Sequence, residues 1–411
     1  MVRFWLFSAS VSYIIFSKDY TIMNGRIKDL LKHKKKDLAV LFVCLVCFVL
    51  CVLWANNGRS FSGSEASDFA EYENAKVLEI LSDNTFQDET ADGGYRGEQM
   101  LTVKVSTGRY KGETMLVYNY VGPIYGVPVK EGDSVTIIVS TYGDGTHQAS
   151  VYELNRLPGI LFLILLFALT TVLIGGKKGV KSLIGLLFIV LTLFLILLPS
   201  LMKGAPTIPM TFIVCVFIAA FSLTVISGVN QKMVCAFLGT VSGVLAAMLF
   251  AQIAQSILRI NGLRMEDVEA LLQLRKSGMK IGLKGLLTAG IIVSSLGAVM
   301  DVTMGLASAI SEVHDADPKL GIKELFLSGM NVGKDMVGTM TSTLILAFLG
   351  SGFVLILYLY SLDLGKYQLL NSAYVSTEII SSLASSIGAI LSIPITAFIS
   401  ARVFSDNKGD Q

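Results

Sequence analysis

Eight long stretches of this 411-residue chain carry almost no charged side chains, and they constrain the fold more than any other feature. Each stretch has at least 20 residues, the length that an α-helix needs to cross the hydrocarbon core of a bilayer. The stretches are 38–58, 157–176, 182–202, 204–231, 233–258, 285–311, 336–362 and 379–401. This pattern predicts an α-helical integral membrane protein with about eight transmembrane helices, and it excludes a soluble enzyme, a fibrous protein and a secreted disulfide scaffold.

The spacing of the stretches predicts the domain organisation. We expect a cytoplasmic basic N-terminus at 1–37, a first transmembrane helix at 38–54, an extracytoplasmic domain at 55–156, a seven-helix membrane domain at 157–401 and a cytoplasmic tail at 402–411. The sidedness follows from the lysines and arginines before the first helix, because basic flanks stay in the cytoplasm. Residues 1–22 are either a signal-like segment or lie before a native start at Met23.

Within the membrane domain, helices are expected at 157–175, 180–199, 207–227, 233–256, 285–310, 339–361 and 377–400. The loop at 257–284 conflicts with this topology, because it should lie outside and yet is rich in lysine and arginine. Either one helix is miscounted, or the loop holds a surface helix. We favour a short interfacial helix at 265–276, where acidic residues precede basic ones along the helix axis.

The extracytoplasmic domain has the pattern of a small β fold. Leu101, Val103 and Val105 alternate with polar residues, and glycine-rich turns separate several such runs, which predicts antiparallel strands in a small barrel of the OB or SH3 type. Residues 55–156 contain 15 acidic and 8 basic side chains. Because nucleic-acid binding requires a basic surface, no nucleic-acid partner is expected.

No enzyme, cofactor or metal signature is found in the sequence. Cys44, Cys47 and Cys51 have the spacing of a thiolate cluster, but they fit better as small apolar residues of a membrane helix. The three histidines are scattered outside the apolar stretches, and no HExxH motif or complete phosphate-binding loop is present. We therefore expect no catalytic residue, no cofactor and no metal site.

Asp301 is the first candidate for function, because it lies deep inside an apolar stretch. Ionisable residues at such depth usually face a cavity or a partner. Helical spacing places small and polar residues on the same face as Asp301, namely Ser294, Gly297, Gly305 and Ser308. The alternative is a structural aspartate that holds a neighbouring helix.

Two further segments supply polar residues to a possible path. Asn331, Asp335 and Thr339 share one helical face, Lys334 is in position to pair with Asp301 or Asp335, and nearby glycines favour a broken helix. The last helix carries a polar stripe that includes Glu378 and Ser385. Together these segments predict a hydrophilic path. For the segment with Asn331, Asp335 and Thr339, an ordinary polar start of the seventh helix is an equal alternative.

Two segments resemble the YibE/F family of bacterial membrane proteins: 297–308 (GAVMDVTMGLAS) and 329–346 (GMNVGKDMVGTMTSTLIL). The segments 175–183 and 237–243 are also similar, and the likeness extends over about 23–401. The resemblance implies an initial helix, an extracytoplasmic domain and a block of helices, in a bacterial plasma membrane. It also implies that a shorter relative without the outer domain is a partner. It implies no particular substrate.

These observations favour a transporter or permease that is ion-coupled through Asp301 and is surrounded by the lipids of the bilayer. The alternative is a membrane scaffold or envelope sensor whose outer domain binds a partner. In the second case, the polar residues inside the helices would only hold the helices together.

Overall fold

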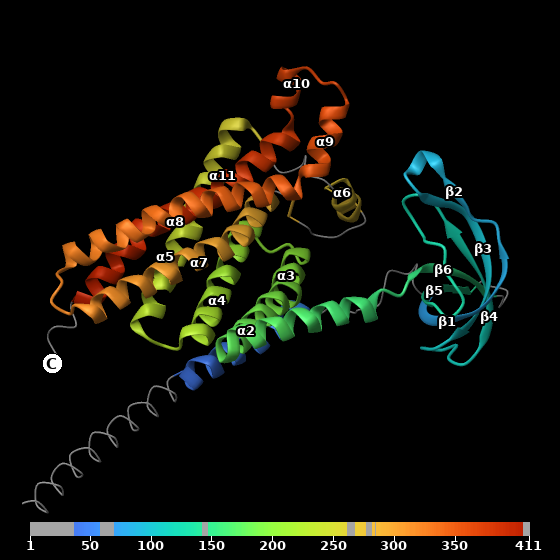
Figure 1. Ribbon diagram of the computed structural model, residues 1–411, viewed down its shortest axis with the longest axis horizontal. Coiled ribbons are helices and arrows are strands. Elements are labelled where there is room, and N and C mark those ends of the chain that lie inside the picture. Colours follow the sequence, from blue (N-terminus) through green and yellow to red (C-terminus); the bar gives the residue numbers. More distant parts are fainter. Residues whose placement is uncertain are drawn as a thin grey trace, which may run out of the picture. The chain divides into compact units, whose positions relative to one another are not determined.

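The computed structural model describes residues 37–57, 70–141, 147–260, 268–276, 282–283 and 285–405 (Figure 1). The predicted N-terminal segment 1–22 and the candidate start at Met23 lie outside these residues. The chain divides into two compact units, which are described separately. One comprises Met1–Asn57 with Gly175–Gln411, and the other comprises Gly58–Ile174.

The second unit contains a closed five-stranded β-barrel. Its strands are β1 (Ala70–Asp83), β3 (Gly94–Val105), β4 (Thr114–Val121), β5 (Ser134–Thr141) and β6 (His147–Leu154), and the short strand β2 (Phe86–Asp88) pairs only with β3. A single-turn 3₁₀ helix, Glu89–Ala91, follows β2. Around the barrel, β1 pairs with β3 and β5, β3 with β4, β4 with β6, and β6 with β5.

The alternation of apolar and polar residues explains this barrel. Leu101, Val103 and Val105 of β3 are buried inside it, and they pack with Val135, Ile137 and their neighbours from the other strands. The prediction of a small barrel is therefore confirmed. The prediction of antiparallel pairing is wrong for one pair, since β4 and β6 are parallel. Five strands cannot close with every pair antiparallel, because an odd number of alternating directions leaves one pair alike.

Among the residues that the structure describes, seven helices are long and apolar enough to cross a membrane. They are Asp37–Asn56, Leu157–Met202, α4 (Thr207–Ser227), α5 (Gln231–Leu258), α7 (Leu286–Ala316), α8 (Ile322–Ser351) and α11 (Ala373–Ser405). Shorter helices are α6 (Val268–Lys276), α9 (Phe353–Ser361) and α10 (Lys366–Leu370). A helix is thus present within the segment predicted at 265–276.

The sequence predicted about eight spans, whereas the structure joins two of them into one run. Leu157–Met202 consists of α2 (Leu157–Thr192), a π-helical segment (Leu193–Leu197) and α3 (Leu198–Met202). At 1.5 Å per residue this run would measure about 70 Å, roughly twice the hydrocarbon core of a bilayer. The run is interrupted at Gly176, where φ is 53° and ψ is −132°. Glycine adopts this backbone conformation without the steric penalty that a side chain would add.

The seventh predicted helix is also shifted. We expected it at 339–361 with a break near its glycines, but α8 begins at Ile322 and runs unbroken through Gly329, Gly333 and Gly338. The break instead comes at Gly352, where α8 ends and α9 starts. Lys334 and Asp335 interrupt the apolar stretch from which the helix was predicted, so its start was placed too late in the sequence. Charged residues do not end a helix that is packed on one side only, because they can lie on its exposed side.

The helices of the first unit have two recognisable ends. At one end, the backbone N–H of Val229 donates to Asp37 (2.7 Å) and Lys232 pairs with Glu312 (3.2 Å). At the other end, the side-chain amide of Asn56 donates to the carbonyl of Leu195 (3.0 Å) and Thr207 donates to the carbonyl of Gly282 (2.9 Å). The described residue Gly282, shortly before α7, therefore lies at the end that holds Asn56, opposite Asp37.

Candidate functional site

The candidate site lies on α7 and α8, which form an antiparallel hairpin. We call the exposed residues between positions 290 and 305 of α7 and between positions 331 and 343 of α8 the hairpin face. On α7 they are Gly290, Ser294, Gly297, Asp301 and Gly305, and on α8 they are Asn331, Lys334, Asp335, Gly338, Thr339, Ser342 and Thr343. The spacing of three and four that the sequence showed around Asp301 is therefore a real helix face, and that face is exposed.

Asp301 is the deepest ionisable group of the hairpin face. Eleven residues separate it from Glu312, which forms an ion pair at the end of the bundle where Lys232 lies. Eleven residues of helix span about 16 Å, roughly half of a 30 Å hydrocarbon core. In a bilayer, a carboxylate at that depth would cost about 3 kcal/mol or more unless water or a partner surrounded it.

The charged groups of α8 lie nearer the end of the bundle than Asp301 does. A Cβ atom on Gly305 would lie 3.3 Å from the Cε atom of Met336, which places Lys334 and Asp335 about level with residues 305–307 of α7. Within the part of the chain that the structure describes, no ion pair joins Lys334 to Asp301 or to Asp335. The predicted internal pairing of Lys334 is therefore not formed.

The hydroxyl groups of the hairpin face are satisfied by their own helices. Thr339 donates to the carbonyl of Met336 (3.1 Å), and Ser342 donates to that of Gly338 (3.0 Å). Ser294 donates to the carbonyl of Ile291 (3.1 Å) and also approaches Ser385 of α11 at 3.5 Å. These hydroxyls tolerate an apolar environment, whereas the charged groups of the same face do not.

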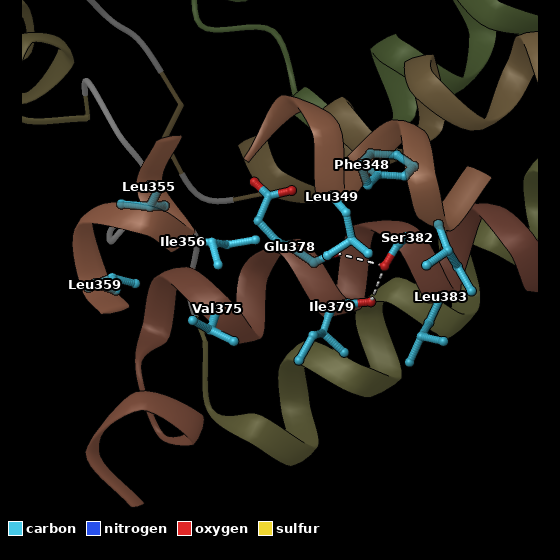
Figure 2. Close-up of a pocket in the computed structure, with 11 residues that line it drawn as sticks. Phe348, Leu349, Leu355, Ile356, Leu359, Val375, Glu378, Ile379, Ser382 and Leu383 are labelled. Carbon is cyan, nitrogen blue, oxygen red and sulfur yellow. Dashed lines mark hydrogen bonds between the residues drawn. The ribbon is translucent and has the colours of Figure 1, made fainter. Parts of the chain in front are cut away.

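The polar stripe of α11 is divided between the bundle interior and a separate cavity. Ser385 is fully buried, as are Gly388 and Ser392 further along the helix. Glu378 instead lines a cavity of about 240 Å³ between α8, α9 and α11. Figure 2 shows its carboxylate among Leu349, Ile356 and other apolar side chains, and shows Ser382 bonded to its own helix.

The structure does not bring Glu378 together with Asp301. Ser294 and Ser385 lie side by side, and α7 and α11 run in the same direction, since Gly329 of α8 contacts both Ile310 and Ala397. Glu378 is thus level with residue 287 of α7, about 20 Å along the helix axis from Asp301. Ser308, by contrast, is half-buried on α7 at the level of Asn331.

Sequence analysis missed a second polar feature, in the closely packed centre of the bundle. Thr240 of α5 and Thr303 of α7 lie 2.8 Å apart through their hydroxyl oxygens, and both residues are fully buried. Around them, Gly243 of α5 lies against Val299 and Ser392. The small residues Gly239, Gly243 and Ala247, at helical spacing on α5, allow this close approach.

Comparison with known proteins gives the family. The family model described as YibE/F-like protein matches residues 163–406, more than half of the chain. The chain belongs to the YibE/F-like family. The match includes α4 to α11 and so all of the candidate site, but it leaves out the barrel strands. No curated protein and no solved structure matches this YibE/F-like chain.

Proposed function

We propose that this YibE/F-like protein is a permease of the bacterial plasma membrane, ion-coupled through Asp301. The domain predicted at 55–156, which holds the barrel, would then lie on the extracytoplasmic side. One observation carries the proposal: a carboxylate lies half-way along a helix long enough to cross a membrane, on a face of small and polar residues. Intramembrane carboxylates of this kind are typical of proton and cation pathways.

The residues of the hairpin face have distinct roles in this proposal. Asp301 would bind and release the coupling proton or cation, because its carboxylate makes no ion pair within the described chain. Asn331, Lys334, Asp335 and Thr339 would line the shallower part of the same path. Gly297 leaves the space beside Asp301 open, because a Cβ atom there would meet no atom within 4 Å. Glu378 lies too far along the bundle to share this step.

Flux measurements in proteoliposomes test the proposal. Proton or cation flux of the wild type should disappear in Asp301→Asn, which keeps the shape of the side chain and removes its charge. Asp315→Asn is the matched control, because Asp315 is exposed near the end of α7 outside the apolar stretch. Flux that is equal in all three proteins would refute coupling through Asp301.

The second candidate function is that of a scaffold or envelope sensor, and the barrel favours it. Its outer surface carries two tyrosine pairs: Tyr72 with Tyr152, at 5.2 Å between ring centres, and Tyr118 with Tyr120, at 6.3 Å. The strand order, closed by one parallel pair, suits a barrel of the OB type, a fold that binds oligosaccharides and oligonucleotides. The acidic charge of the domain argues against nucleic acid.

This second function has a separate test. Replacing Tyr72 and Tyr152 by serine should abolish binding of the full chain to envelope glycans or to a partner, and it should leave flux unchanged. For the scaffold or sensor function, we propose the shorter relative as the partner of the helices. The bilayer surrounds the helices in both proposed functions. We propose no enzymatic activity for either function.

A further inference from the structure

The outward surface of the bundle differs sharply from helix to helix. On α5, bulky apolar residues face outward, such as Leu238, Leu245 and Leu249, and α11 likewise exposes Leu383, Leu391 and Phe398. Within α7, all of which the structure describes, no large apolar side chain is exposed. The same holds for α8 between Leu327 and Leu346. The surfaces of α5 and α11 suit lipid chains, whereas the hairpin face does not.

The glycines show that the hairpin face is an open packing surface. A Cβ atom on Gly388 would lie 2.7 Å from the Cβ of Ala247, so that glycine is already packed against another helix. A Cβ atom on Gly297 or on Gly338 would meet no atom within 4 Å. Close helix contact therefore uses Gly388 inside the bundle, whereas Gly297 and Gly338 of the hairpin face make no such contact.

The charged groups of the hairpin face have no oppositely charged partner among the described residues of one chain. Asp301 carries a carboxylate and Lys334 an ammonium group, and both are exposed. Neither forms an ion pair among the described residues. A surface that carries both signs, small residues and no bulky apolar side chain is complementary to a copy of itself, and closed two-fold contacts are the commonest way in which proteins use such a surface.

We propose that the hairpin face packs against the hairpin face of a second copy of this chain, so that the polar path lies between two subunits and each contributes one wall. The proposal rests on the membrane location given under the proposed function. The dimer adds to that function the requirement that a single chain supplies only one wall of the path. Asp301 of each copy then faces polar groups of the other copy instead of lipid.

Site-specific photo-crosslinking of the full chain in membranes tests the contact. A benzophenone amino acid replaces Gly338, on the face, or Leu249, on the lipid-suited side of α5. Position 338 should yield a crosslinked dimer of the chain, and position 249 should yield none. An adduct of position 338 with a different protein would overturn the second copy as occupant, and so would adducts with lipid only.

A second variant separates loss of contact from loss of fold. Gly297→Leu should convert the purified dimer to a monomer that keeps the helix content of the wild type, because a Cβ atom at this position meets no atom within 4 Å. A wild type that is monomeric in nanodiscs would overturn the proposal. A dimer that carries no flux would refute the permease and leave the dimer standing, whereas flux from a monomer would refute only the dimer.

Discussion

Gly243 of α5 and Gly388 of α11 face each other so closely that a Cβ atom on either would lie within 2.9 Å of the other's carbonyl oxygen. The contact is reciprocal: the separation is 2.9 Å from position 243 and 2.8 Å from position 388. Two helix backbones approach this closely only where neither residue has a side chain. This crossing fixes α11 beside α5 and thereby sets where Ser385 and Glu378 lie.

Gly388→Ala should therefore destabilise the bundle. The added methyl group would lie 2.7 Å from Ala247 Cβ and would push α5 and α11 apart, which typically costs about 1–3 kcal/mol in a well-packed core. The melting temperature of the purified protein in detergent measures the effect. Gly350→Ala of α8 is the matched control, since it adds the same methyl group to an exposed helix position outside the hairpin face, with no atom within 4 Å of the new Cβ. Equal melting temperatures for the two variants would contradict the packing shown here.

The sequence predicted well those features that depend on neighbouring residues. Alternation of apolar residues in β3 is local, so it predicted which side of the strand is buried. The spacing around Asp301 likewise predicted which residues share its helix face. Both conclusions need only the geometry of one element.

Features that depend on contacts between segments far apart in the sequence could not be predicted from local patterns. Whether the face of Asp301 points inward or outward depends on where α5, α8 and α11 pack, and the expected pairing with Lys334 failed for that reason. The parallel closure of β4 on β6 is equally non-local. The start of α8 was missed because the helix was predicted from an uncharged apolar stretch, and charged side chains interrupt that stretch within α8.

Gly108→Ala should destabilise the barrel more than Gly112→Ala does. Both glycines have positive φ, +63° and +93°, so each substitution incurs the strain of a left-handed residue, about 1–2 kcal/mol. Only at position 108 does the new Cβ overlap another group, the carboxylate of Glu73.

That carboxylate accepts hydrogen bonds from the backbone N–H of Arg109 (3.0 Å) and from the hydroxyl of Thr107 (2.7 Å). Its displacement should add about 1–3 kcal/mol to the loss. Hydrogen exchange of the barrel amides in the full chain measures both variants. Equal loss of protection would mean that backbone strain alone accounts for both substitutions.

Asn119→Leu should also destabilise the barrel, through a buried pair of amides. Asn119 donates to the Gln99 side-chain oxygen (2.9 Å) and to the Val127 carbonyl (3.0 Å), and both side chains are 1 % exposed. Leucine would leave the Val127 carbonyl without its donor, at a cost of about 1–3 kcal/mol. The segment after β4 should then exchange its amide hydrogens faster than the wild type. Thr114→Leu, at the exposed start of β4, should leave that exchange unchanged.

Acid should weaken the barrel around Asp88. Hydrogen bonds from the Thr90 hydroxyl and backbone N–H, together with the Arg96 guanidinium, lower the pKa of Asp88 from 3.8 to about 2. Because the folded-state pKa is the lower one, the unfolded chain binds more protons between these two values. The contribution of Asp88 to stability is therefore complete above about pH 5, falls as the pH drops toward 2, and is lost below that.

Hydrogen exchange of the β2–β3 region in the full chain, corrected for the intrinsic effect of pH, measures this loss. Wild-type protection should decrease from about pH 5 to about pH 2. Asp88→Asn should have lower protection at pH 5 and a shallower dependence on pH, because it has no carboxylate to protonate. Asp83 contributes in the same direction, since hydrogen bonds from Thr85 lower its pKa as well, so some dependence should remain in the variant. A pH dependence in Asp88→Asn as steep as that of the wild type would show that other carboxylates control the acid response.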